Sequence, residues 1–205
     1  NLILIMIVKQ VSFNAEGRQD LIDGINVLAD AVKSTLGARG QTVLIESENH
    51  THGITITKDG VTVAKSINLM HPTQNLAVRM MKEAAENTSI AAGDGTTTAI
   101  VITQAIVLEA QKRIKPHMNV TEIIKAIKES CDSVVSSLSG MAKKVNGKRL
   151  MDVATVSSNN DTYLGKIISD AYKSVGDSGV VTVENAAGSQ TYSEVVNGMK
   201  VDRGY

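Results

Sequence analysis

The sequence predicts a mainly α-helical domain with a small β-hairpin, followed by a segment that mixes helices and strands. Three observations support this fold class. Four long segments repeat apolar residues every three or four positions, which is the spacing of one face of a helix. Two short β-branched runs lie between the first two of these segments. Aromatic residues are scarce, with no Trp, one Phe and four Tyr, so aliphatic side chains must fill the core.

The predicted helices end at recognisable signals. Their ranges are residues 19–36, 75–92, 96–112 and 119–138. Gly37 follows the first helix as its stop, and Gly93-Asp94-Gly95 breaks the second. Asn119 is a good N-cap for the fourth helix, whose apolar spacing is the clearest in the chain. Cys131 lies on that apolar face, so we expect it to be part of the core.

The two β-branched runs, residues 42–46 and 54–58, predict a hairpin, and Asp59-Gly60 turns the chain out of it. The apolar run Leu2–Val8 is far shorter than the ~20 residues of a membrane-spanning helix, and it lacks the marks of a signal peptide. We interpret residues 1–7 as an N-terminal extension or an edge strand. Met6 begins a run that suits a translation start, which makes residues 1–5 a candidate remnant from upstream.

The composition of the sequence changes beyond Gly140, where a Lys-rich, Gly-containing link follows the fourth predicted helix. We place a domain boundary at Met141–Gly147. Two shorter helices are expected after it, one from about Arg149 and one over residues 164–174. Strands are expected near residues 180–184 and 194–196.

Charge and cysteine content exclude several classes of protein. The chain has 21 basic and 21 acidic side chains and no block of like charge, which argues against binding to nucleic acid. No segment suits insertion in a membrane. Cys131 is the only cysteine, so an internal disulfide is impossible and a reducing compartment such as the cytoplasm is expected.

The run Gly93-Asp94-Gly95-Thr96-Thr97-Thr98 has the features of a phosphate site. A helix start offers free backbone N–H groups and a positive dipole end, and the threonines add hydroxyl donors. Asp94 would repel phosphates unless a cation lay between them, which suggests Mg²⁺. The run matches neither the P-loop nor the dinucleotide fingerprint. An ordinary Asp-Gly turn with a Thr cap explains the same residues, and local sequence leaves both interpretations open.

Several motifs occur in one order along the chain. They are Thr35-Leu36-Gly37, residues 56–61, residues 93–99, Val156-Ser157, residues 175–184 and residues 198–205. In this order they resemble the nucleotide-site motifs of the group I chaperonins, the bacterial and organellar type. The resemblance extends from about Val8 to the end of the chain. Several long motifs in register are more specific than any single one.

The resemblance implies a domain plan and a function. Residues 8–142 would be the N-terminal half of an equatorial ATP-binding domain, 143–198 the first segment of an α/β intermediate domain, and 199–205 the start of an apical domain. The protein would be an ATP-dependent protein-folding chaperone using ATP, Mg²⁺ and K⁺. Its partners would be its own copies in a heptameric ring, single or double, non-native polypeptides, and a co-chaperonin lid. A phage gene is a possible source.

The resemblance also implies which residues contact the nucleotide. Thr35, Leu36 and Gly37 would line it. Its phosphates would be held by Gly95, Thr96, Thr97 and Thr98. Asp94 would bind Mg²⁺, and oxygens of Thr35, Lys58 and Thr97 would bind K⁺.

The remaining assignments concern hydrolysis and the nucleoside. Lys58 and Asp59 would lie beside the γ-phosphate, with Asp59 as the catalytic residue near the attacking water. Val156 and Ser157 would approach the nucleoside. A structural ion pair or a turn is the alternative for Lys58 and Asp59.

The chain departs from the family pattern at two prolines and at its end. Ala38 stands where the family has Pro, and Lys143 replaces a hinge Pro, although Gly198 keeps the other hinge position. The main catalytic Asp of the family is expected beyond Tyr205. The alternative function is therefore a truncated, non-hydrolysing nucleotide-binding or ring-assembly relative.

Overall fold

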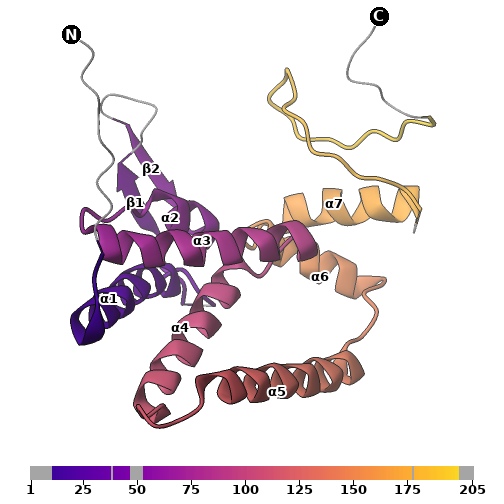
Figure 1. Ribbon diagram of the computed structural model, residues 1–205. Helices are drawn as coiled ribbons and strands as arrows, with labels where there is room; N and C mark the ends of the chain where they lie inside the picture. Colours follow the sequence, from indigo (N-terminus) through magenta and orange to yellow (C-terminus); the bar gives the residue numbers. More distant parts are fainter. Residues whose placement is uncertain (1–10, 38, 47–52, 177, 199–205) are drawn as a thin grey trace, which may run out of the picture. The chain divides into compact units, whose positions relative to one another are not determined.

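The computed structural model describes residues 11–37, 39–46, 53–176 and 178–198 (Figure 1). Its elements, in order, are α1 (Asn14–Lys33), β1 (Val43–Glu46), β2 (Ile54–Thr57), α2 (Gly60–Ser66), α3 (Pro72–Ala92), α4 (Thr96–Arg113), α5 (Val120–Met141), α6 (Lys148–Ser157) and α7 (Thr162–Val175). The predicted fold class, mainly helical with a small hairpin, is confirmed. Within these ranges no helix is long and apolar enough to cross a membrane. The N-terminal extension and the predicted start of the apical domain lie outside the described residues.

The chain forms two compact units, Asn1–Val120 and Thr121–Tyr205. The division falls at the start of α5, whereas the sequence places a domain boundary at Met141–Gly147. The predicted equatorial and intermediate domains are defined by the family plan and stay a prediction.

The core of the first unit forms where α1 packs against α3 and α4, with α2 against α1 and α4 (Figure 1). Helix α1 buries one face, as its apolar spacing predicts. The buried apolar residues of α1 and α3 are Ile22, Ile25, Leu28, Ala29, Val32, Ala77, Val78, Met81 and Ala85. Gly24 lets the two helices approach closely, because a Cβ there would lie 2.3 Å from the carbonyl oxygen of Gln74.

A buried polar network joins α1 to α4. Gln104 is 3% exposed, and its Nε2 donates to Oδ1 of Asn26 at 2.8 Å and to Oδ1 of Asp30 at 3.2 Å. Its Oε1 accepts a hydrogen bond from Lys33. The buried amide is thus satisfied on both sides, as a buried polar group must be. The network fixes the C-terminal end of α1 relative to α4.

Strands β1 and β2 pair antiparallel, with Val43 opposite Thr57 and Glu46 opposite Ile54, which confirms the predicted hairpin. The prediction for Asp59-Gly60 was incomplete. Asp59 is the N-cap of α2, a helix of seven residues that was not predicted from the sequence. A carboxylate N-cap was the signal available for this helix.

In the second unit α6 packs against α7. The contact is close because a Cβ at Gly165 would lie 2.2 Å from Oγ1 of Thr155. Ala154 and Ser169 are buried in this helix pair. Both helices were predicted, within a few residues of their ends.

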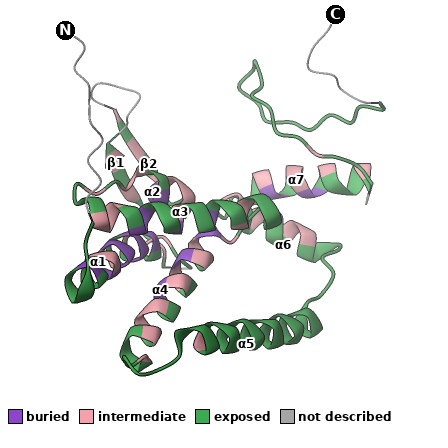
Figure 2. Ribbon diagram, in the orientation of Figure 1, coloured by how far each residue is buried: buried purple, intermediate pink, exposed green. Residues whose placement is uncertain are grey.

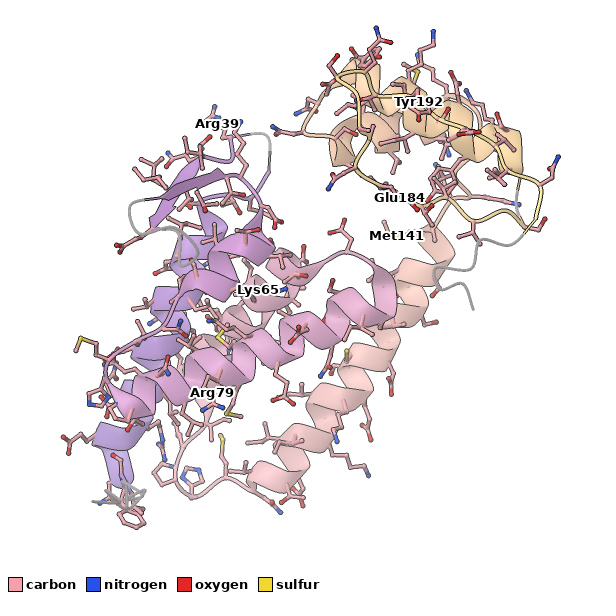
Figure 3. All side chains as sticks on the ribbon, turned by 90° about the horizontal axis from the view of Figure 1, so that it is seen from above. Arg39, Lys65, Arg79, Met141, Glu184 and Tyr192 are labelled. Carbon is pink, nitrogen blue, oxygen red and sulfur yellow. The ribbon has the colours of Figure 1, made fainter. Side chains whose placement is uncertain are left out.

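Two predictions for the second unit are wrong. Helix α5 forms as expected, but none of its residues is buried and Cys131 is exposed (Figure 2). Periodic spacing reveals an apolar face, not whether anything covers it. Residues 180–184 and 194–196 form no strand, because neither run pairs with a second strand in the part of the chain described. They belong to the irregular segment after α7 that carries Glu184 and Tyr192 (Figure 3).

Candidate functional site

The loop after α1 holds Thr35 in a closed turn. The backbone N–H of Thr35 donates to the carbonyl of Val32 at 3.1 Å, and its hydroxyl donates to the same carbonyl at 2.8 Å. Gly37 has a φ of 76°, a left-handed conformation that glycine adopts without strain. Leu36 is about half exposed at this turn. The three residues predicted to line the nucleotide therefore form a short, ordered loop.

The loop between α3 and α4 leaves the start of α4 uncapped. Gly93 ends α3 with a φ of 75°, and Gly95 begins α4 with a φ of 93°. Oδ1 of Asp94 accepts the N–H of Gly95 at 2.6 Å. No side chain caps the first turn of α4, so its backbone N–H groups remain available. An uncapped helix start with a positive dipole end suits a bound anion.

The hydroxyl of Thr96 in the first turn of α4 lacks a partner. Thr96 is 5% exposed, and its Oγ1 makes no hydrogen bond with any described residue. A buried hydroxyl without a partner costs about 1–3 kcal/mol. Such a group is rare in native structures, because buried polar groups almost always have a hydrogen-bond partner.

Thr35 and Thr97 converge on Gly60, the first residue of α2. A Cβ on Gly60 would lie 2.1 Å from Oγ1 of Thr97 and 3.1 Å from Oγ1 of Thr35. The two hydroxyls thus surround one point, although they come from the loop after α1 and the first turn of α4. Gly60 itself is buried. The structure therefore brings together three of the motifs that the sequence singles out.

Asp59 is already engaged by α2. Its carboxylate accepts the N–H groups of Val61 at 3.3 Å and Thr62 at 2.9 Å, and the hydroxyl of Thr62 at 2.7 Å. Partial burial opposes ionisation, but these hydrogen bonds outweigh it, with a smaller contribution from the ammonium of Lys65. The pKa of Asp59 therefore lies below its ordinary value. The carboxylate is ionised at neutral pH and is a weak base.

Replacing Asp59 by alanine is expected to lower the free energy of unfolding by about 1 kcal/mol at pH 7, the usual value of an N-cap. A folded-state pKa below the unfolded value makes this contribution present above pH ~4 and lost as the pH falls through the folded pKa. Urea unfolding at pH 7 and pH 3 measures both effects. Asp59→Asn is the matched control, because asparagine keeps the cap without the charge. Equal losses at both pH values for Asp59→Ala would contradict an ionised cap.

Three other predicted site residues, Lys58, Val156 and Ser157, are exposed. Lys58 forms no ion pair with a carboxylate among the described residues. The structure therefore does not support the alternative that Lys58 and Asp59 form a structural ion pair. Val156 and Ser157 lie exposed at the C-terminal end of α6. They belong to the second unit, and their approach to the nucleoside stays a prediction.

Two residues of the site were missed by sequence reasoning, Gly60 and Thr62. Gly60 lies in a recognised motif, residues 56–61, but its local sequence predicts only a turn. Its closeness to Thr35 and Thr97 depends on how α1, α2 and α4 pack, which no local pattern reveals. Thr62 had a usable signal, since it is the third residue after a potential Asp N-cap.

The residues present suit a metal ion that arrives with phosphate. Within the described ranges no three acidic, His or Cys side chains form a metal cluster. Mg²⁺ needs no such cluster, because it is commonly bound by one or two carboxylates together with substrate phosphates and waters. Exposed Asp94 at the start of α4 supplies one carboxylate. Hydroxyls of Thr35 and Thr97, which face one point, are oxygen ligands of the kind that K⁺ takes.

Known proteins resemble this chain in sequence and in fold. The sequence profile described as the TCP-1/cpn60 chaperonin family matches residues 28–205. Chaperonin gp146 from bacteriophage EL 2 (Pseudomonas aeruginosa), crystallised in the presence of ATP-BeFx, is 31% identical with a TM-score of 0.67, covering 78% of this chain and 28% of that one. A second crystal form of gp146 has a TM-score of 0.68.

A group III chaperonin in the open state shares the fold, with 24% identity, a TM-score of 0.64, and coverage of 79% of this chain and 32% of the other. The chain thus spans about a third or less of the length of these chaperonins. The match to the family profile covers most of the chain, which belongs to the TCP-1/cpn60 chaperonin family.

Proposed function

We propose that the chain is the N-terminal part of a group I-like chaperonin subunit, and that it binds Mg²⁺-ATP at the Gly93–Thr98 loop. The observation that carries the proposal is the convergence of Thr35 and Thr97 on Gly60 beside the uncapped start of α4. The unpartnered hydroxyl of Thr96 in the same turn supports it. The presence of ATP-BeFx with the similar gp146 is consistent with a nucleotide as the ligand.

The described residues would each contribute a distinct interaction. The N–H groups of α4 and the threonine hydroxyls would donate to phosphate oxygens, as at other helix starts. Asp94 would hold Mg²⁺, which when bound neutralises phosphate charge. The loop of Thr35 to Gly37 would line the nucleotide. In the whole protein, we propose a cytoplasmic ring of copies that assists the folding of non-native polypeptides, with a co-chaperonin lid.

Binding of Mg²⁺-ATP tests the site through Asp94→Ala. We expect the variant to bind Mg²⁺-ATP at least about tenfold more weakly than the unchanged chain, since a charged interaction is lost. In EDTA the variant should bind ATP at least as tightly as the unchanged chain, because without a cation the carboxylate of Asp94 only repels the phosphates. Isothermal titration calorimetry measures both, with exposed Asp132→Ala on α5 as the control.

Three results of these titrations would each contradict a different part of the proposal. Unchanged binding of Mg²⁺-ATP by Asp94→Ala would remove Asp94 from the site. Absence of ATP binding by the unchanged chain, under conditions where circular dichroism shows it folded, would reject the proposed function. Loss of binding in Asp132→Ala would show that the effect is not local.

The hydrogen bonds that Asp59 already accepts favour a second candidate function, in which this chain binds ATP without hydrolysing it. A carboxylate that already accepts three hydrogen bonds and has a lowered pKa is poorly suited to take a proton from water. We propose that Asp59 orients groups near the γ-phosphate instead. Release of phosphate from bound ATP separates the candidates: sustained turnover by the chain Asn1–Tyr205 would exclude the non-hydrolysing one.

A further inference from the structure

Position 60 needs a glycine because the space around it is crowded, and not because of its backbone conformation. Gly60 is not among the glycines with positive φ, so an L side chain would fit its torsion angles. Glycine at the start of a short helix such as α2 is unfavourable compared with alanine, because it loses more conformational freedom on folding. The glycine at position 60 is therefore best explained by a close contact that a larger residue would disrupt.

A side chain at position 60 would collide with two hydroxyl groups. A Cβ at position 60 would lie 2.1 Å from Oγ1 and 3.3 Å from Cβ of Thr97, and 3.1 Å from Oγ1 of Thr35. The hydroxyl of Thr35 is held by its hydrogen bond to the carbonyl of Val32, so it cannot turn away freely. Relief must come from Thr97, by rotation of its side chain or by separation of α2 from α4.

This environment differs from those of other crowded glycines. At Gly24 a Cβ would meet the backbone of a neighbouring helix, which concerns only helix spacing. At Gly17 it would meet the side chain of Ser12 at 2.7 Å, at the start of α1. Only at Gly60, among the described residues, would it meet hydroxyls of two residues from the candidate nucleotide site.

We propose that Gly60 is a positioning residue for nucleotide binding: its missing side chain leaves the hydroxyls of Thr35 and Thr97 directed at one shared point. The inference rests on the proposed function, and it adds a residue that touches no ligand and acts through Thr97. An alanine at this position would displace the Thr97 hydroxyl while leaving Asp94 and the start of α4 in place.

Calorimetric titration of the chain with Mg²⁺-ATP tests the proposal through Gly60→Ala, Thr97→Ala and the double variant. Each single substitution is expected to weaken binding about tenfold, the effect of one lost hydrogen bond to a charged group. Because Gly60 acts through Thr97, the double variant should bind no more weakly than Thr97→Ala alone, and the two effects should not add. Gly17→Ala is the control and should bind normally, because Gly17 is also crowded by a hydroxyl, that of Ser12, but lies near the start of α1, at the opposite end of this helix from Thr35.

Each outcome has one meaning. Normal binding by Gly60→Ala, or additive losses in the double variant, would overturn the role of Gly60 while leaving the proposed function intact. No binding by the unchanged folded chain would overturn the proposed function and, with it, this inference. If Gly60→Ala alone does not fold, the comparison of Thr97→Ala with the double variant decides, since the smaller residue 97 relieves the contact: equal affinities support the role and a further loss overturns it.

Discussion

Replacing Leu28 by alanine is expected to lower the free energy of unfolding by about 2–5 kcal/mol. Leu28 is completely buried in the cluster of α1, α2, α3 and α4. Truncation removes its apolar contacts and leaves a cavity that rigid neighbouring helices fill only in part. For a chain whose total stability is in the usual range of roughly 5–15 kcal/mol, such a loss is large.

The neighbouring Val27 offers a matched control for Leu28. It lies on the same helix but is 46% exposed, so Val27→Ala should change the free energy of unfolding by no more than about 0.5 kcal/mol. Urea denaturation followed by circular dichroism compares the two variants. Similar losses for both would mean that α1 does not bury the face described.

A Gly24→Ala substitution is expected to destabilise the first unit by roughly 1–3 kcal/mol, the usual effect of overpacking. The new Cβ would lie 2.3 Å from the carbonyl oxygen and 2.9 Å from the carbonyl carbon of Gln74. These are backbone atoms of α3, which cannot rotate away as a side chain would. The helices must therefore separate, and this loss exceeds the gain in helix propensity of alanine over glycine.

The same substitution at Gly140 provides the contrast. A Cβ at Gly140, on α5, would meet nothing within 4 Å, so alanine should stabilise the helix by about 0.5–1 kcal/mol. Thermal and urea denaturation of both variants, monitored at 222 nm, measures the difference. If Gly24→Ala were as stable as the unchanged chain, α1 and α3 would not be packed at the distance described.

Most of the helical fold was predictable because the relevant signals are local. The spacing of Ile25, Leu28 and Val32 predicts the buried face of α1, and Gly93 marks the end of α3 as expected. The predicted stop at Gly37 was less accurate, because α1 ends earlier, at Lys33. Helix α2 escaped prediction because Val61, Thr62 and Val63 favour strands locally, while the Asp59 cap and tertiary packing decide for helix.

The candidate site was predictable in its residue types but not in its geometry. Gly93 to Thr98 have the glycines and hydroxyls that a phosphate needs, and the structure confirms a helix start at that point; the absence of a side-chain cap there was not predicted. The meeting of Thr35 and Thr97 at Gly60 depends on contacts among three segments distant in the sequence. Such contacts arise from packing of whole helices, so no local pattern contains them.

Helix α5 has a consequence for how the chain melts. The heat-capacity change of unfolding arises from apolar surface that becomes exposed to water, and α5 has no buried residue to expose. Its melting would add almost nothing to that change. The calorimetric signal would come from the cluster around Leu28 and from the α6–α7 pair, and per residue it would fall below the ~12–15 cal/mol/K of ordinary globular domains.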